Sequence, residues 1–144
     1  MARYLPRAFA APGDIEARCG MAQASLTAGL AVRLTDVAGV HCLAEAIGGL
    51  YGHPHGYCCA ACMPPVMDYN LPVSRDKYAR LAIDFIRQLN NDLDVPPLSK
   101  LLRAPDLDLL GEKAQQNTSA PSNPRAANAA AFTAMFANEL NRAR

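Results

Sequence analysis

Apolar residues recur at spacings of three and four along most of this chain, and Pro and Gly interrupt the pattern at intervals. This spacing places apolar side chains on one face of an α-helix, whereas a half-buried β-strand needs alternation at every second residue. No segment shows a convincing alternation. The sequence therefore predicts an all-α fold, a bundle of about six to eight helices without a sheet.

The clearest predicted helix runs from Asp14 to Arg33, because Pro12-Gly13 before Asp14 is typical of a helix start. A second helix is predicted from Asp36 to Leu50, with Asp36 as its N-cap. A third is predicted from His55 to Asn70, and Pro64-Pro65 should kink or interrupt it. A turn is predicted at 71–73, and Ser74 should cap the helix that follows it. Further helices are predicted at 98–103, 106–116 and 126–142, with a polar loop at 117–125.

Length and composition limit the class of protein. A chain of 144 residues fits a single domain, and 51% hydrophobic residues are enough for a buried core. A net charge of +1 without a basic run argues against nucleic acid or a membrane surface as partner. No apolar stretch is long enough to span a bilayer, and the residues after Met1 do not resemble a signal peptide. We therefore expect a cytoplasmic protein.

All three histidines lie between His41 and His55, on either side of a glycine-rich turn. Such a turn can fold two helices together and bring His41 and His55 to one point, where imidazoles can bind Fe, Zn, Ni or Cu. The alternative is that each histidine is an ordinary hydrogen-bonded core residue. The spacing alone leaves both interpretations open.

The five cysteines do not resemble a secreted disulfide framework, because their number is odd and three of them fall between Cys58 and Cys62. Cys59 and Cys62, together with His53 and His55, could form a tetrahedral zinc site. The preferred interpretation is that the cysteines are small core residues of an apolar helix. We therefore expect the three thiols to be mostly buried and not to converge on His53.

The segment around the histidines resembles the second signature of the iron-containing alcohol dehydrogenases, G-x-x-H-x-x-x-H-x-x-G followed by P-H-G. The two histidines that bind metal in that family match His41 and His55. Further landmarks occur in family order: Arg3–Ala8, Met21–Leu26, Ala28–Ala31, Pro65–Met67, Tyr69–Pro72, Lys77–Ala79 and Asn123–Arg125.

The resemblance implies the helical C-terminal domain of a dehydroquinate synthase-like or iron-containing alcohol dehydrogenase. It implies a divalent metal, Fe²⁺ first and Zn²⁺ as the alternative, and NAD(P) in the complete enzyme acting on a small alcohol or aldehyde. The family's other two ligands, an Asp and a His, and its nucleotide-binding domain precede this region. We expect residues 1–144 to be one metal-binding domain without the nucleotide-binding domain, since no glycine-rich phosphate loop occurs.

Two departures from the family pattern affect the expected site. Glu45 stands where the signature has its second histidine, and the stretch from Leu81 to Ile86 is short. Glu45 could complete a 2-His-1-carboxylate set, because it shares a helix face with His41; we prefer a solvated residue without a catalytic role. Tyr51 and Tyr57 are candidates to line the pocket. The chain alone is expected to be inactive, as a truncated, non-catalytic remnant or as half of a split enzyme. The expected partners are a separate nucleotide-binding chain or further copies of this chain in a homo-oligomer.

Overall fold

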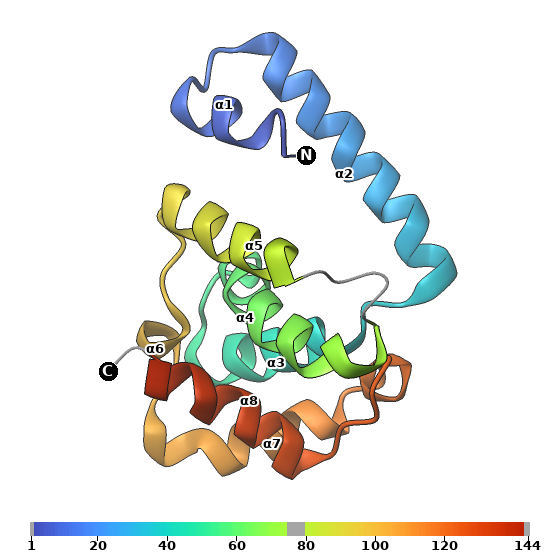
Figure 1. The fold of residues 1–144 in the computed structure, drawn as a ribbon, viewed down its shortest axis with the longest axis vertical. Helices are drawn as coiled ribbons and strands as arrows, with labels where there is room; N and C mark the ends of the chain where they lie inside the picture. Colours follow the sequence, from blue (N-terminus) through green and yellow to red (C-terminus); the bar gives the residue numbers. More distant parts are fainter. Residues whose placement is uncertain (1, 75–79, 143–144) are drawn as a thin grey trace. The chain divides into compact units, whose positions relative to one another are not determined.

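The computed structural model describes residues 2–74 and 80–142, and these ranges contain helices and no strand (Figure 1). The all-α prediction is confirmed. The elements in chain order are α1 (Leu5–Ala10), α2 (Ile15–Thr35), α3 (Ala38–Tyr51), α4 (His55–Asn70), η1 (Leu71–Val73), α5 (Arg80–Asp92), α6 (Leu98–Leu101), η2 (Ala104–Asp106), α7 (Leu107–Gln116), η3 (Ala120–Ser122) and α8 (Ala129–Arg142).

The chain divides into two compact units, and the first comprises Met1–Asp36. Its helices α1 and α2 pack against each other. Asp14 begins α2 as predicted: its Oδ1 accepts a hydrogen bond of 3.0 Å from the Ala17 N–H. Its other carboxylate oxygen lies 2.8 Å from the Arg7 guanidinium. The cap therefore stabilises the start of α2 and connects it to α1.

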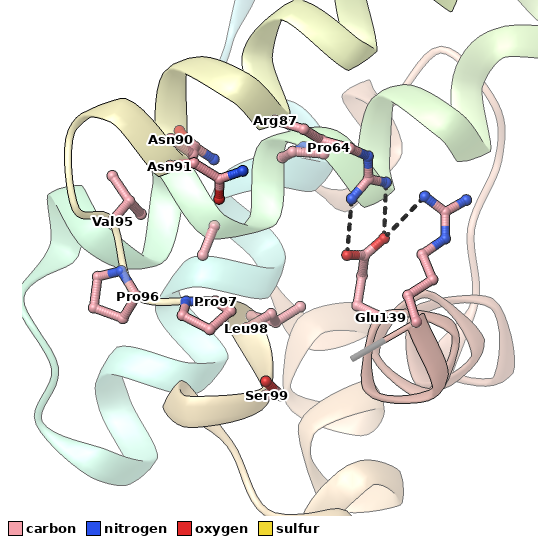
Figure 2. Close-up of a pocket in the computed structure, with 12 residues that line it drawn as sticks. Pro64, Arg87, Asn90, Asn91, Val95, Pro96, Pro97, Leu98, Ser99 and Glu139 are labelled. Carbon is pink, nitrogen blue, oxygen red and sulfur yellow. Dashed lines mark hydrogen bonds and ion pairs between the residues drawn. The ribbon is translucent and has the colours of Figure 1, made fainter. Parts of the chain in front are cut away.

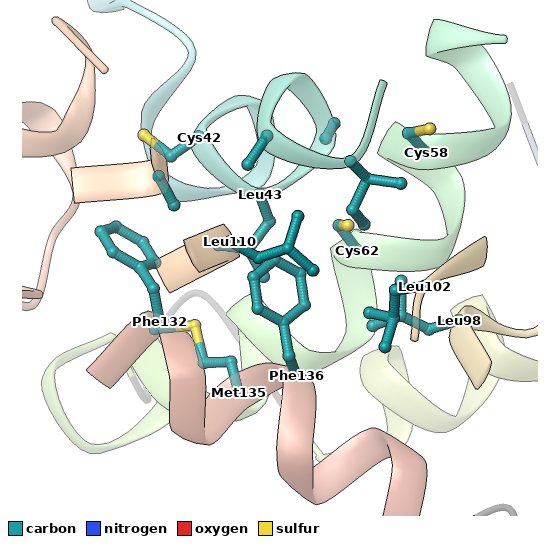
Figure 3. Packing of buried hydrophobic residues seen from close by; sticks show 14 of the residues in the cluster. Cys42, Leu43, Cys58, Cys62, Leu98, Leu102, Leu110, Phe132, Met135 and Phe136 are labelled. Atoms are coloured by element: carbon teal, nitrogen blue, oxygen red, sulfur yellow. The ribbon is translucent and has the colours of Figure 1, made fainter. Parts of the chain in front are cut away.

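The second unit, Val37–Arg144, contains the remaining helices. Helix α3 packs against α4 and α7, and α8 packs against α7, α4 and α6. Buried side chains from these helices meet in one core (Figure 3). Its largest members are Leu43 and Ile47 from α3, Leu110 from α7, and Phe132 and Phe136 from α8. This core fixes α3 and α4, the two helices on which the sequence placed its candidate ligands.

The predicted N-cap of the second helix is wrong. Asp36 follows α2 as its C-cap residue, with a φ of 80°, and its N–H donates to the Val32 carbonyl at 3.0 Å. Helix α3 begins only at Ala38, itself at a φ of 50°. Asp36 has a ψ of 172°, which lies outside the right-handed and left-handed helical regions, so its backbone turns the chain out of α2.

Helix α4 has the predicted bounds, but Pro64-Pro65 do not interrupt it. A proline inside a helix has no N–H for the carbonyl four residues before it. For Pro64 that carbonyl belongs to Ala60, and it accepts a hydrogen bond of 2.7 Å from the side chain of Asn90 on α5. The tertiary contact supplies the donor that the proline removes, and the helix continues.

Other predicted bounds were close. The turn at 71–73 is one turn of 3-10 helix, and the loop at 117–125 contains η3. Helix α8 begins at Ala129, because the Asn128 side chain accepts from the Ala131 N–H at 3.0 Å. The predicted start of a helix after Ser74, with the landmark Lys77–Ala79, lies outside the described residues. None of the helices described combines the length and apolar character needed to cross a bilayer.

Candidate metal centre

A tight connection folds α3 back onto α4. Gly52 ends α3 in the left-handed region, with a φ of 73°, and its N–H donates to the Gly48 carbonyl at 2.9 Å. Left-handed backbone is readily adopted by glycine because it has no Cβ. Only His53 and Pro54 then separate this cap from α4, which begins at His55. The glycine-rich turn therefore closes a helical hairpin.

The hairpin brings His41 of α3 and His55 of α4 together, as the sequence analysis expected. Their ring centroids are 5.0 Å apart, and the ring planes are inclined by 54°. His41 is half-buried and His55 is exposed, so the pair lies at the surface of the second unit. The geometry allows both imidazoles to face one ion after a small adjustment; whether they bind one stays a prediction.

His41 also carries an unsatisfied group. Its Nδ1 is buried and has no hydrogen-bond partner, and it is the only buried side-chain nitrogen or oxygen of the described residues in that condition. Buried polar atoms are usually satisfied, and a ring nitrogen without a partner is therefore informative. This nitrogen is not the one near Cys59: the opposite ring nitrogen, Nε2, lies 4.0 Å from Cys59 Sγ.

Cys59 is the residue that the sequence analysis placed incorrectly. It is half-buried, and its Sγ lies 3.3 Å from His55 Nε2 and 4.0 Å from His41 Nε2. The three residues offer ligand atoms that all lie within 4.8 Å of one another. The missed signal was the spacing: residues four apart share one helix face, so Cys59 had to lie beside His55.

The other two cysteines of the cluster are core residues, as expected. Cys58 and Cys62 have no exposed surface, and burial raises the pKa of both thiols. Burial, with the charges of Cys58 and Glu45, also raises the pKa of Cys59 to about 11. Without a bound ion, Cys59 therefore holds its proton at neutral pH.

The alternative zinc set is not assembled. Of the potential ligands in the described part of the chain, only His41, His55 and Cys59 form a group of three or more. Cys62 points into the core, and the His53 ring lies 5.9 Å from the Tyr51 ring instead of joining the other imidazoles. The prediction that the thiols do not converge on His53 is confirmed.

Glu45 is exposed, and its Oε2 accepts a hydrogen bond of 2.6 Å from the Asn117 side chain. It does not belong to the three-donor group, although it lies one helical turn after His41. The 2-His-1-carboxylate arrangement is therefore not formed in this structure. The contact with Asn117 instead connects α3 to the end of α7.

The two tyrosines proposed for the pocket behave differently. The Tyr51 hydroxyl donates to Asp106 at 2.7 Å, and burial together with this contact raises its pKa. Tyr51 and His53 line a cavity of about 510 Å³ with Arg103 and Asp106. Tyr57 is 46% exposed. Tyr51 thus lines a pocket next to the hairpin, whereas Tyr57 lies at the surface.

A separate cavity of about 260 Å³ lies between α4, α5, α6 and α8 (Figure 2). At its edge Arg87 donates to both oxygens of Glu139, at 3.0 and 2.8 Å, and to Asp68 at 2.8 Å. These contacts satisfy the guanidinium and raise the pKa of Arg87. The charged side chains at this cavity are paired with one another, and neither His41 nor His55 lines it.

Comparison with known proteins decides the family. The sequence profile of the C-terminal part of the Fe-containing alcohol dehydrogenase family matches residues 1–93. The chain belongs to the iron-containing alcohol dehydrogenases. Choline dehydrogenase of Bacillus subtilis is 32% identical over 97% of this chain and 40% of its own length. The 1,3-propanediol dehydrogenase of Klebsiella pneumoniae is 32% identical over 94% of the chain and 41% of its own.

Solved structures of the family agree with this fold. A 1,3-propanediol oxidoreductase matches 96% of the chain with a TM-score of 0.88 and 32% identity, and the chain covers 42% of it. An alcohol dehydrogenase from Oenococcus oeni matches 95% with a TM-score of 0.87 and 28% identity. This iron-containing alcohol dehydrogenase chain thus has the family's helical C-terminal fold and spans about two-fifths of its relatives' length.

Family membership also bears on the cofactors of the complete enzyme. The family is named for iron, and a relative from Bacillus methanolicus, 28% identical, is an NAD-dependent methanol dehydrogenase. The names of the family and of this relative thus refer to iron and to NAD, and this chain covers 42% of that relative's length.

Proposed function

We propose that this chain is the metal-binding part of an NAD(P)-dependent alcohol dehydrogenase, and that His41 and His55 are two of its metal ligands. The observation that carries the proposal is the 5.0 Å separation of the two imidazoles on the α3–α4 hairpin. The family match over residues 1–93 supports it, because it includes both histidines, in a segment that resembles the family's signature.

The residues present fit a divalent ion. Neutral imidazole binds Fe²⁺ and Zn²⁺ well, and His41 and His55 offer ligand atoms within 4.8 Å of each other. Fe²⁺ is the first choice because of the family, and Zn²⁺ is the alternative. A divalent metal held there would supply Lewis-acid polarisation of an alcohol or aldehyde oxygen. The chain's own contribution is to hold and orient the ion on two helices anchored in one core.

Glu45 has no part in this proposal as a ligand or as a catalytic group. Its carboxylate is hydrogen-bonded to Asn117 and exposed to solvent. A Glu45→Gln variant keeps a group of the same shape at this position, and it should bind metal as the wild type does. Loss of binding in this variant would instead support the 2-His-1-carboxylate interpretation.

Turnover requires more than these 144 residues. Hydride transfer needs a nicotinamide held at near-attack distance from the carbinol carbon. The sequence contains no glycine-rich loop for the phosphates of a dinucleotide. We propose that a nucleotide-binding part, on the same protein or on a separate chain, supplies NAD(P) and the remaining ligands. A homo-oligomer is the other proposed assembly. The substrate class would be a small alcohol or aldehyde, and the compartment the cytoplasm.

The test is metal binding followed by reconstitution. Titration calorimetry with Zn²⁺, and with Fe²⁺ under anaerobic conditions, should give one site per chain, strongly weakened in His41→Ala and His55→Ala. His53→Ala is the matched control and should bind normally, since His53 lies outside the donor group. Unchanged binding in both His41→Ala and His55→Ala would refute the proposed ligands.

Reconstitution then tests the catalytic part of the proposal. The chain should be mixed with a separately produced nucleotide-binding part of a family relative, and alcohol-dependent reduction of NAD or NADP should be followed. Activity that requires both parts and is lost in His41→Ala supports an enzyme. Metal binding without activity in any combination would indicate a non-catalytic module.

A further inference from the structure

The thiol of Cys59 faces both candidate metal ligands, and the family signature assigns it no role. Its Sγ lies 3.3 Å from His55 Nε2 and 4.0 Å from His41 Nε2. Cys59 reaches this position because it follows His55 by one turn of α4, while His41 approaches from α3. Two helices therefore present three potential ligand atoms to one point.

The separations agree with those of a coordinated ion. Bond lengths of about 2.3 Å to sulfur and about 2.05 Å to imidazole nitrogen, at a tetrahedral angle, place sulfur and nitrogen about 3.6 Å apart. The two observed sulfur–nitrogen distances of 3.3 and 4.0 Å lie on either side of this value. Each sulfur–nitrogen distance would change by about 0.3 to 0.4 Å to reach it.

Neighbouring donors do not compete for this place. Cys58 and Cys62 are fully buried in the core, and Glu45 is bonded to Asn117. Of the potential ligands in the described residues, only His41, His55 and Cys59 form a group of three or more, with ligand atoms within 4.8 Å of one another. Cys58, Cys62 and Glu45 are therefore excluded from the donor group of His41, His55 and Cys59.

We propose that Cys59 is a third metal ligand, which with His41 and His55 forms a His₂Cys site that prefers thiophilic divalent ions such as Zn²⁺. This rests on the proposed function, because it uses the same two histidines. Binding converts the thiol to a thiolate, and its proton passes to solvent. In the isolated chain these three protein ligands would leave a further position for water, which the remaining ligands of the complete enzyme would take. A thiolate also favours zinc over iron more strongly than imidazoles alone do.

Cobalt is the probe of choice, because thiolate ligation of Co²⁺ produces a near-ultraviolet sulfur-to-cobalt charge-transfer band besides the visible ligand-field bands. The full 144-residue chain should show both. Cys59→Ala should lose the charge-transfer band, and its affinity for Zn²⁺ should fall by at least about tenfold. The ratio of Zn²⁺ to Fe²⁺ affinity should fall as well. Far-ultraviolet circular dichroism verifies that each variant is folded.

Matched controls separate the cysteines. Cys19→Ser, at an exposed position of α2, and Cys62→Ser, in the core, should retain the band and the affinity. Cys59→Ser provides a second, isosteric variant and should also lose the sulfur band. A band that survives in both Cys59 variants would overturn the assignment.

The failure of this inference can be distinguished from failure of the proposed function. The wild type could show ligand-field bands but no sulfur band, and His41→Ala could lose the ligand-field bands. This result would support the histidine ligands and would refute the assignment of Cys59 as a ligand. Cobalt binding that is unaffected in His41→Ala and His55→Ala would refute the proposed function itself. The absence of any cobalt or zinc binding in the wild type would refute both.

Discussion

Asn70 and Asn123 donate hydrogen bonds to each other in the interior: Asn70 Nδ2 lies 3.0 Å from Asn123 Oδ1, and Asn123 Nδ2 lies 2.8 Å from Asn70 Oδ1. The same Asn123 oxygen accepts from the Gly39 N–H at 3.3 Å. The pair therefore connects the end of α4 and the loop before α8 to the first turn of α3. Residue 39 is two positions before His41, so the pair also anchors the helix that carries this imidazole.

Replacing Asn123 should destabilise the second unit. Asn123→Ala leaves the Asn70 amide and the Gly39 N–H buried without partners, and we expect a loss of about 1–3 kcal/mol in the free energy of unfolding. Urea unfolding followed by circular dichroism measures it. Asn91→Ala, on the exposed surface of α5, is the control and should change stability by less than about 0.5 kcal/mol. Equal stability of the two variants would contradict the role given to the pair.

Two glycines should respond to alanine with opposite signs. A Cβ at Gly111 would collide with the Thr133 hydroxyl and lie 2.7 Å from the Ala129 carbonyl oxygen, so Gly111→Ala should cost about 1–3 kcal/mol at the contact of α7 with α8. A Cβ at Gly49 meets nothing within 4 Å, so Gly49→Ala should stabilise α3 by up to about 1 kcal/mol. Thermal unfolding of both variants checks the prediction, and a shift in the same direction for both would contradict it.

Arg87 joins α5 to α4 and α8 through Asp68 and Glu139. Arg87→Met removes the shared cation and leaves the two carboxylates with the more exposed Arg142. We expect a loss of about 1–3 kcal/mol, because charge-assisted hydrogen bonds at partly buried groups are lost. Chemical denaturation measures it, with Gln88→Ala on the exposed face of α5 as control. A variant as stable as that control would show that the network contributes little.

The cap of α2 should depend on pH. The Ala17 N–H and the Arg7 side chain hold the pKa of Asp14 below its ordinary value. The unfolded chain therefore binds this proton more tightly than the folded one does. The stabilisation is complete above the unfolded-state pKa, about 4, and is lost as the pH falls through the lower folded-state pKa.

An Asp14→Asn variant tests this sign. Asparagine still caps the helix, but it does not titrate, so part of the acid-induced decrease in thermal stability should disappear. The slope of Tm against pH between about 5 and about 2 is the measurement. Asp84→Asn, at an exposed position on α5, should leave that slope nearly unchanged. Identical slopes for the wild type and Asp14→Asn would contradict the prediction.

Removing metal should not unfold the chain. The core of Leu43, Ile47, Leu110, Phe132 and Phe136 is apolar and contains none of the proposed ligands, so EDTA should strip a bound ion while the far-ultraviolet circular dichroism is retained. The isolated chain should also show no alcohol-dependent reduction of NAD or NADP, with or without Fe²⁺, Zn²⁺ or Ni²⁺. Turnover that is abolished in His41→Ala would show that these residues form a complete site.

Local signals predicted much of the fold. The three-and-four spacing identified an all-α chain, Asp14 marked the start of α2, and Pro54 and Asn70 bounded α4 correctly. Asp36 was placed at the wrong end of a helix, because its residue type favours an N-cap, whereas its N–H donates to the Val32 carbonyl at the end of α2. The uninterrupted course of α4 through Pro64 could not be predicted locally, since its missing donor comes from Asn90 on another helix.

The candidate site was predicted in part. The glycine-rich turn and the family signature brought His41 and His55 together, and the structure has them in contact distance. Cys59 was considered as a ligand only with Cys62, His53 and His55, and the preferred interpretation assigned it to the core, although its spacing from His55 predicts a shared face. The contact between Glu45 and Asn117 joins distant parts of the sequence, so no local pattern could have indicated it.

The left-handed cap at Gly52 has a consequence for how the chain folds. It closes the turn between α3 and α4 with two further residues, and every proposed donor therefore lies between residues 41 and 59. Closing so short a loop costs little chain entropy, and contacts of low sequence separation form early. The donor cluster should consequently assemble with the first helical hairpin, before α7 and α8 complete the core around it.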